Sequence, residues 1–247
     1  MVGAVGNDSN GTGFLNELAR LSVDISNVQV LDGFTTGVAP ITVDETTGEN
    51  LIVVIGGANN EFDLTSSSIE AIKNSQISIF QNEIKLETTK AAIKIAYESG
   101  SMTIFNPSPI ENVDFDFLRA GVRCLVLNEH EIEHFSKFLE KDENLFSKID
   151  SLELIICTRG AKGAEVKNWK GQTKMVGIER TVSKVVDTTG AGDCFLGAFS
   201  AAWSNHKNGG EAIFEEICEF VRKANNVASM SVERKGTQAS YPEMDDF

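Results

Sequence analysis

The chain has 247 residues, of which 41% are hydrophobic, and its 36 acidic and 22 basic residues give a formal net charge of −14. The hydrophobic fraction excludes wholesale disorder, and the length fits one large α/β domain or two small ones. The acidic charge argues against nucleic acid or an anionic membrane as a partner, since both require clustered Lys and Arg. The four cysteines are widely separated, the start is not signal-like, and no apolar run reaches roughly 18 residues, so we expect a cytoplasmic protein with reduced thiols.

The N-terminal part of the sequence predicts a strand, a helix and a projecting hairpin. Residues Met1–Gly6 are typical of a short buried strand, and an amphipathic helix is expected from about Thr12. Between about residues 35 and 56, two apolar arms surround a polar turn at Asp44–Gly48. This pattern predicts a β-hairpin that projects from the main sheet as an edge or a lid.

Beyond this hairpin, short apolar runs alternate with amphipathic ones. Strands are predicted at Ile77–Phe80, Met102–Phe105, Arg123–Leu127, Leu152–Cys157 and Val182–Val186, with a second hairpin over Ala164–Ile178. Helices are predicted at Leu86–Tyr97, Glu129–Leu139, Ala191–Trp203 and Ala212–Ser231. The alternation predicts an α/β fold with a mainly parallel sheet and helices on both faces, and the absence of repeats and linkers favours a single domain over residues 1–247.

A glycine-rich turn, Asp187–Asp193, leads into the helix predicted from Ala191. A helix N-terminus offers unpaired N–H groups and a positive dipole end, and Gly190 and Gly192 let the backbone approach an anion closely. The turn can therefore cradle a phosphate, with Asp193 placed to accept the proton of an attacking hydroxyl. A lone Gly-x-Gly fits equally well a turn that only redirects the chain, with Asp193 as a helix cap.

The complete seven-residue turn closely resembles the signature of the ribokinase-like (PfkB) carbohydrate kinases. The other segments that match this family occur in its order along the chain: Val5–Asp8 with Gly11, Thr36–Ala39, Gly57–Asn59, Gln81–Glu83, Asn106–Pro109, Asn128–Glu131, Thr158–Gly163 and Arg234–Gly236. The resemblance covers almost the whole chain. It implies a three-layer sandwich with a small β lid and a nucleotide-binding part over about residues 123–247.

The resemblance also implies a reaction, the ATP-dependent transfer of a phosphoryl group to the hydroxymethyl group of a sugar. D-ribose, giving ribose 5-phosphate, is the first candidate, and adenosine or another sugar stays open. In this family pattern Asp193 is the catalytic base and contacts the substrate, and Glu83 binds the sugar hydroxyls. Gly190, Ala191 and Gly192 would form the anion hole that receives the γ-phosphate. From the residues alone, Glu83 is equally a solvated carboxylate at a strand end.

By the same resemblance the ATP-binding residues are Asn128, Thr158, Arg159, Gly160, Ala161, Lys162, Gly163, Gly192, Asp193 and Asn225. Glu131 would hold Mg²⁺ through water, because Mg²⁺ keeps several waters and few direct protein ligands. A monovalent cation, K⁺, would be held by Asp187, Thr189, Ser231, Arg234, Gly236 and Ser240. An exposed helix carboxylate at Glu131, an ordinary turn at residues 158–163 and a polar helix surface at Asn225 remain the alternatives.

A second motif competes for part of this site. His130–His134 reads His-Glu-Ile-Glu-His, the zinc-protease pattern, with both histidines on one face of a predicted helix. The only other histidine, His206, does not have the spacing of a third ligand in that class. We therefore favour the Asn-x-x-Glu interpretation of the same residues.

The sequence departs from the family at its N-terminus. It has no counterpart of the family's first strand with an Asn-x-Asp pair, or of the following Gly-Gly-Lys-Gly-x-Asn segment, and both of these grip the sugar. We therefore expect an N-terminally incomplete fold. An incomplete gene product, a segment supplied in trans and a nucleotide-binding remnant all stay open as explanations.

This departure leaves a second function open, a catalytically impaired ATP-binding or interaction protein on the same fold. Loss of a central strand would expose backbone hydrogen-bonding groups and core surface, so we also expect poor solubility or self-association. A homodimer formed through the lid is one arrangement that the resemblance allows. The nucleus is the alternative compartment if the source is eukaryotic.

Overall fold

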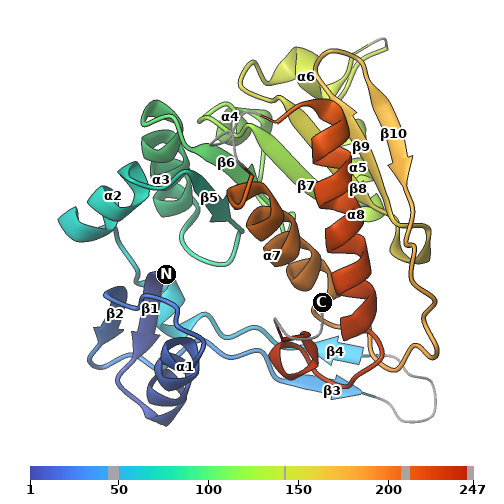
Figure 1. Ribbon diagram of the computed structural model, residues 1–247. Helices are drawn as coiled ribbons and strands as arrows, with labels where there is room; N and C mark the ends of the chain where they lie inside the picture. The colour runs from blue at the N-terminus through green and yellow to red at the C-terminus, as the bar shows by residue number, and fades with distance from the viewer. Residues whose placement is uncertain (44–49, 142, 207–211, 244–247) are drawn as a thin grey trace.

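The computed structural model describes residues 1–43, 50–141, 143–206 and 212–243 (Figure 1). The strands are β1 (Val2–Gly6), β2 (Asn27–Leu31), β3 (Ile41–Val43), β4 (Asn50–Ile52), β5 (Ile77–Phe80), β6 (Met102–Phe105), β7 (Cys124–Asn128), β8 (Leu154–Thr158), β9 (Ala164–Asn168) and β10 (Thr173–Val176). The α-helices are α1 (Ser9–Arg20), α2 (Ser66–Lys73), α3 (Leu86–Glu98), α4 (Phe115–Leu118), α5 (Glu129–Ser136), α6 (Leu145–Lys148), α7 (Ala191–Ser204) and α8 (Phe214–Ser231). Short 3-10 helices occur at Gly57–Asn60, Gly160–Lys162 and Gln238–Ser240.

The main sheet has six strands in the order β10-β9-β8-β7-β6-β5. Strands β5 to β8 are parallel, and β9 and β10 add antiparallel strands at one edge. In Figure 1, α7 and α8 lie across one face of this sheet. The predicted α/β fold with a mainly parallel sheet flanked by helices is therefore confirmed.

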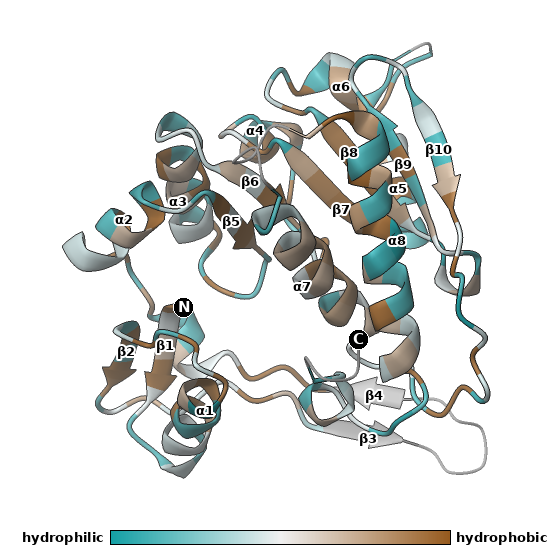
Figure 2. Ribbon diagram, in the orientation of Figure 1, coloured by the Kyte–Doolittle hydropathy of each residue, from teal (hydrophilic) through white to brown (hydrophobic). Residues whose placement is uncertain are grey.

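Alternation along the strands divides the core between the two faces of the sheet. Ile104 and Val126 point to the face that α7 and α8 cover, where Phe199 of α7 is fully buried. The neighbouring strand residues Phe105 and Leu125 point to the other face, where they pack with residues of α3 to α6. Figure 2 shows these strands as hydrophobic along their length, as expected for strands that are covered on both faces.

The N-terminal segment forms a separate unit beside the main sheet. Strand β1 pairs with β2 in parallel, and β3 pairs with β4 as the predicted hairpin. The predicted turn at Asp44–Gly48 lies outside the described residues. Within this unit, Asp8 connects the start of α1 to the segment before the hairpin. Its carboxylate accepts hydrogen bonds from the N–H of Gly11 at 2.8 Å and from the hydroxyl and N–H of Thr36 at 2.7 and 2.8 Å.

Several predicted boundaries differ from the structure. Helix α1 begins at Ser9 rather than near Thr12, because Asp8 is its N-cap. The predicted strand at Val182–Val186 was wrong: these residues form no strand, and Val185 is 59% exposed. The N–H of Val186 instead donates to the carbonyl of Val232 at 2.8 Å, so this segment runs beside the end of α8. Strand β2 and helices α2, α4 and α6 were not predicted.

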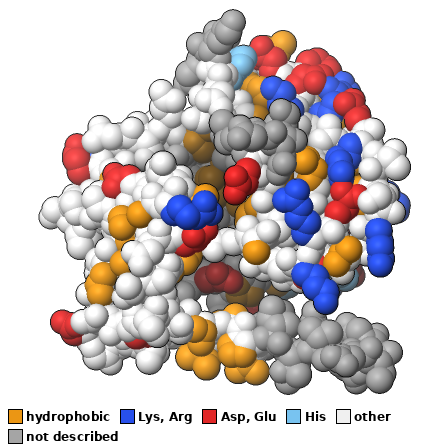
Figure 3. Space-filling model, turned by 60° about the horizontal axis from the view of Figure 1, so that its bottom comes forward, with side chains coloured by type: hydrophobic (Ala, Val, Ile, Leu, Met, Phe, Trp, Pro, Cys, Tyr) orange, Lys and Arg blue, Asp and Glu red, His pale blue; other side chains and the backbone are white. Residues whose placement is uncertain are grey.

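Strand β5 has a paired neighbour on one side only within the described residues. Ile79 in this strand is 45% exposed. Hydrophobic side chains also gather along the lower edge of the face in Figure 3, and Val53, Val54 and Ile55 at the end of the hairpin are exposed. Edge strands with exposed apolar side chains favour pairing between chains. No helix within the described residues is both long and apolar enough to cross a membrane.

We expect the purified chain to self-associate through β5. Light scattering coupled to size-exclusion chromatography at micromolar concentration should give a mass above that of the monomer. Ile79→Lys, which places a charge on the edge, should shift the chain toward monomer, whereas Val54→Lys on the hairpin should not. A wild-type monomer that melts cooperatively would refute the prediction, and a shift with Val54→Lys alone would place the contact on the hairpin.

Candidate active site

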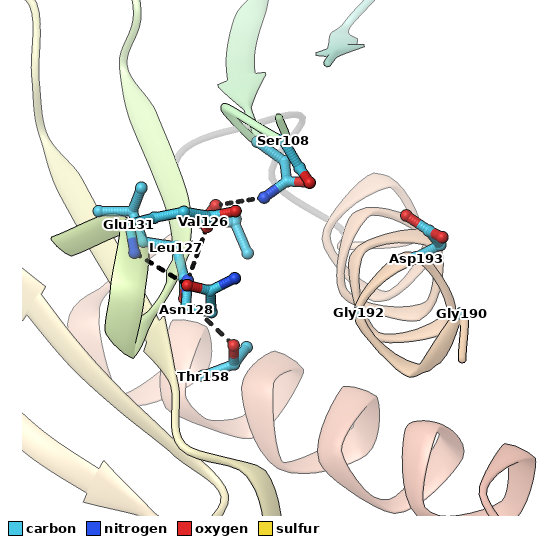
Figure 4. Close-up of a pocket in the computed structure, with 10 residues that line it drawn as sticks. Ser108, Val126, Leu127, Asn128, Glu131, Thr158, Gly190, Gly192 and Asp193 are labelled. Atoms are coloured by element: carbon cyan, nitrogen blue, oxygen red, sulfur yellow. Dashed lines mark hydrogen bonds between the residues drawn. The ribbon is translucent and has the colours of Figure 1, made fainter. Parts of the chain in front are cut away.

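A pocket of about 190 Å³ opens where the carboxyl ends of β6, β7 and β8 face the N-terminus of α7 (Figure 4). The carboxyl edge of parallel strands is the usual ligand site in α/β sheets. The pocket is lined by Asn106, Ser108, Val126, Leu127, Asn128, Glu131, Thr158, Gly190, Gly192 and Asp193. Six of these, Asn128, Glu131, Thr158, Gly190, Gly192 and Asp193, were predicted as site residues from the sequence.

The glycine-rich turn forms the N-terminus of α7. Gly190 is the N-cap residue in a left-handed conformation, with φ at 75°, and a side chain there would be strained. Ala191, Gly192 and Asp193 follow as the first helical residues, so the helix opens with N–H groups that have no partner within the helix. Figure 4 shows this end of α7 across the pocket from Asn128 and Thr158. The arrangement can receive an anion between the helix and the strand ends.

Asp193 is an exposed residue that lines the pocket, but the surrounding protein partly shields its carboxyl from water, and this desolvation raises the pKa of the carboxyl. The pKa of Glu83 is also raised, first by its own partial burial and then by the negative charge of Asp193. Glu83 lies on the loop between β5 and α3 and is not among the pocket-lining residues. The contribution of Asp193 to this shift shows that the two carboxylates lie within electrostatic range of each other.

Asn128 and Glu131 form a capping box at the start of α5. The N–H of Asn128 donates to Glu131 Oε2 at 2.8 Å, and the N–H of Glu131 donates to Asn128 Oδ1 at 2.9 Å. Glu131 is only 6% exposed, and this burial raises its pKa, while the Asn128 N–H partly offsets the shift. The capping box holds the Glu131 carboxylate at the pocket wall with one of its two oxygens engaged, so the alternative of an exposed helix carboxylate is excluded.

The loop after β8 is positioned by hydrogen bonds and ion pairs. The Thr158 hydroxyl donates to the carbonyl of Leu127 at 3.1 Å. The Arg159 guanidinium pairs with Glu129 at 3.0 Å and Glu165 at 2.7 Å. The loop continues through Gly160, Ala161 and Lys162 in a 3-10 turn to Gly163 at φ 90°. Because two carboxylates hold the Arg159 side chain, the backbone of the loop is the part that can contact a nucleotide.

Asn225 lies behind that loop rather than on the pocket wall. Its side chain is 5% exposed and donates to the carbonyls of Val176 at 2.8 Å and Gly177 at 3.4 Å. A side chain added at Gly163 would meet the Asn225 amide at 3.1 Å. The alternative of a polar helix surface at Asn225 is excluded, because α8 buries this residue against the loop.

The residues predicted for a monovalent cation lie on two adjoining segments. Asp187 accepts hydrogen bonds from the N–H of Thr189 and the N–H of Gly236, both at 3.0 Å, and the Gly236 contact is the largest cause that lowers its pKa to about 2. The backbone N–H of Arg234 donates to the carbonyl of Ser231 at 3.1 Å. Ser240 is fully buried, with its hydroxyl 2.7 Å from the carbonyl of Thr237. The Gly236 hydrogen bond therefore joins the C-terminal segment to the first residue of the glycine-rich turn.

The model of the pfkB family of carbohydrate kinases matches residues 1–244. The chain belongs to the pfkB family of carbohydrate kinases. It is 33% identical over 255 residues to the ribokinase of Schizosaccharomyces pombe, a match that covers 99% of this chain and 76% of the relative. The prediction of a carbohydrate kinase is thereby confirmed.

Solved structures of ribokinases have the same fold as this pfkB family chain. The ribokinase of Giardia lamblia superimposes with a TM-score of 0.88 at 28% identity, covering 99% of this chain and 81% of that chain. The Arabidopsis thaliana ribokinase, solved in complex with ribose and ATP, superimposes with a TM-score of 0.83 at 25% identity, covering 98% and 78%.

The structure gives the competing zinc motif no support in this pfkB family chain. Among the described residues, no three His, Cys, Asp or Glu side chains are placed to hold a metal ion together. His134 packs against the rings of Phe135 and Phe138. Glu131 is engaged with Asn128 instead of a histidine.

Three residues of the site were assigned no role from the sequence, although two of them lie in the segment Asn106–Pro109 that matches the family. Asn106 and Ser108 line the pocket, and the Asn106 amide donates to the carbonyl of Val126 at 2.8 Å. The position of a polar residue directly after an apolar strand could have indicated this role, since such residues lie at the carboxyl edge of the sheet, where ligands bind. Tyr241 lies against Gly190, and no local pattern indicates that contact.

Proposed function

We propose that this chain transfers the γ-phosphoryl group of ATP to the hydroxymethyl group of D-ribose, giving ribose 5-phosphate and ADP. The observation that carries the proposal is the position of Asp193, a carboxylate of raised pKa in the first turn of α7, facing the pocket beside two glycines. The ribokinase relatives, one of them solved with ribose and ATP, support the choice of substrates.

In the proposed reaction, Asp193 accepts the proton of the sugar hydroxyl while the hydroxyl oxygen bonds to the γ-phosphorus. The bond between that phosphorus and the oxygen bridging to the β-phosphate breaks, and ADP leaves with the electron pair. Backbone N–H groups at Gly190, Ala191 and Gly192 stabilise the charge that develops on the phosphoryl oxygens. Glu83 would orient the sugar through its hydroxyls, because its carboxylate lies near Asp193.

For ATP, we propose that Asn128 and Thr158 contact the phosphates at the pocket wall. The loop from Arg159 to Gly163 would follow the nucleotide with its backbone, and Asn225 would support that loop from behind.

The donor chemistry of the pocket fits Mg²⁺. Glu131 accepts one hydrogen bond through Oε2, which leaves oxygen capacity toward the pocket for the water shell of the ion. When bound, Mg²⁺ neutralises phosphate charge. The ionised Asp187 and the carbonyl-rich segment from Ser231 to Ser240 suit K⁺, whose role would be to fix the glycine-rich turn.

A coupled assay for ADP with ATP, Mg²⁺, K⁺ and D-ribose tests the proposal. We expect ribose-dependent ADP formation that rises when K⁺ replaces choline as the counter-ion. Parallel reactions with 2-deoxyribose, fructose and adenosine determine the preferred acceptor. If calorimetry shows ATP binding but no acceptor yields ADP, the proposed kinase is refuted in favour of a nucleotide-binding protein on this fold.

A further inference from the structure

Tyr241 brings a hydroxyl group to the N-terminus of α7. A Cβ atom built on Gly190 would lie 2.7 Å from the Tyr241 hydroxyl oxygen, so this oxygen is packed against the glycine-rich turn itself. Gly190 is the N-cap residue of α7, and three residues further on lies Asp193. The phenol therefore lies beside the same helix end that faces the pocket.

The loop that carries Tyr241 lies against the glycine-rich turn. Tyr241 directly follows the buried Ser240, and its N–H donates to the carbonyl of Gln238 at 3.2 Å. The loop is in turn bound to the glycine-rich turn, because the Gly236 N–H donates to Asp187 at 3.0 Å and Thr237 lies 3.3 Å from a Cβ built on Gly190. The Gly236 hydrogen bond and the packing of Thr237 against Gly190 therefore hold the loop that carries Tyr241 beside the turn.

Tyr241 is not among the residues that line the pocket, but its hydroxyl adjoins Gly190, which lines the pocket. Burial is the main cause that raises the pKa of Tyr241 to about 12, and the negative charge of Asp193 adds to it. At neutral pH the phenol is thus a hydrogen-bond donor. Within the described part of the chain this hydroxyl has no hydrogen-bond partner, and it is not among the fully enclosed side-chain atoms, so it is free to donate to a bound group.

We propose that Tyr241 is a catalytic residue whose hydroxyl donates a hydrogen bond to the phosphoryl group at the N-terminus of α7. This inference rests on the proposed kinase function and adds a side-chain donor to an anion hole otherwise made of backbone N–H groups. A donor aimed at the transferring group strengthens as charge develops, so its contribution belongs to kcat more than to substrate binding.

Tyr241→Phe tests the proposal, because it keeps the ring and removes only the hydroxyl. We expect kcat to fall by about 10²-fold, the size typical of one lost anion-hole donor, with KM for ATP and for the sugar within about twofold of wild type. Tyr97→Phe is the matched control: Tyr97 lies at the end of α3, packed against Gly121, and its variant should keep wild-type kcat. A Tyr241→Phe enzyme with kcat within twofold of wild type overturns the proposal.

A binding measurement separates this proposal from the proposed function. Calorimetry with ADP and tetrafluoroaluminate, which mimics the transferring phosphoryl group, should give at least about tenfold weaker affinity for Tyr241→Phe, with ADP affinity unchanged. This readout needs no turnover, so it decides the role of Tyr241 even if no sugar is phosphorylated. Equal affinity of both variants for the mimic, or no binding of it by the wild-type chain, overturns the proposal. A merely structural role would lower the melting temperature and weaken ADP binding as well.

Discussion

Asp193→Asn should lower sugar-dependent kcat by at least about 10³-fold, within the range expected for loss of a general base. The amide has the same shape as the carboxylate but cannot accept the hydroxyl proton. It leaves the backbone of the turn Gly190–Gly192 in place, so the affinity for ATP should stay within about twofold. Steady-state kinetics and calorimetry with ATP measure the two quantities on the same preparation.

Asp116→Asn is the matched control for this substitution. Asp116 also lies in the first turn of a helix, α4, but its carboxylate is exposed and pairs with Lys90 at 2.6 Å, away from the pocket. Its variant should keep wild-type kcat. An Asp193→Asn enzyme that retains a tenth or more of wild-type kcat would show that another group takes the proton.

The raised pKa of Asp193 predicts a pH dependence of wild-type activity and a change in the melting temperature of Asp193→Asn. Activity requires the ionised carboxylate, so kcat/KM of the wild type should fall as pH decreases through a pKa above the ordinary aspartate value of 3.8. The folded state binds this proton more tightly than the unfolded chain does, so the ionised form destabilises the fold above that pKa. Asp193→Asn should therefore melt at a higher temperature than wild type at pH 7 while being inactive, which excludes misfolding as the cause.

The main strands could be predicted because each is an apolar run that ends at a polar residue. Asn106 follows β6 and Asn128 ends β7, and the strands predicted at Ile77–Phe80, Met102–Phe105, Arg123–Leu127 and Leu152–Cys157 match the observed ones within two residues. The four-residue helices α4 and α6 were missed because one turn shows no periodicity. The valines of Val182–Val186 suggested a strand through their β propensity, but a contact with Val232 far along the chain determines their conformation.

The parts of the site that follow from one short segment were predictable, and those that need two distant segments were not. The spacing of glycines before a predicted helix indicates the turn with Gly190 and Asp193. The nearness of Glu83 to Asp193, and of Tyr241 to Gly190, depends on how β5, α7 and the C-terminal loop pack together. The resemblance to the family supplied Glu83, but no pattern supplied Tyr241.

Gly190→Ala should also impair catalysis strongly, although less than loss of the base, by displacing the glycine-rich turn. At φ 75° an alanine costs about 1–2 kcal/mol, and its methyl group would also approach the Tyr241 hydroxyl at 2.7 Å and Thr237 at 3.3 Å. Relief of this contact must move either the turn or the C-terminal loop. Since a displacement of about 1 Å in a positioned group can cost 10²-fold in rate, we expect kcat to fall by about that factor.

The control for this substitution lies in the same helix. Gly197 is an exposed residue in the middle of α7, with no atom within 4 Å of a built Cβ and no left-handed conformation. Gly197→Ala should leave kcat unchanged and stabilise the fold by up to about 1 kcal/mol, because alanine favours the helix. Comparing Gly190→Ala with Gly197→Ala therefore distinguishes the effect of a displaced turn on kcat from the effect of an added methyl group on the stability of α7. A Gly190→Ala enzyme with wild-type kcat would mean that the anion is bound elsewhere than at this turn.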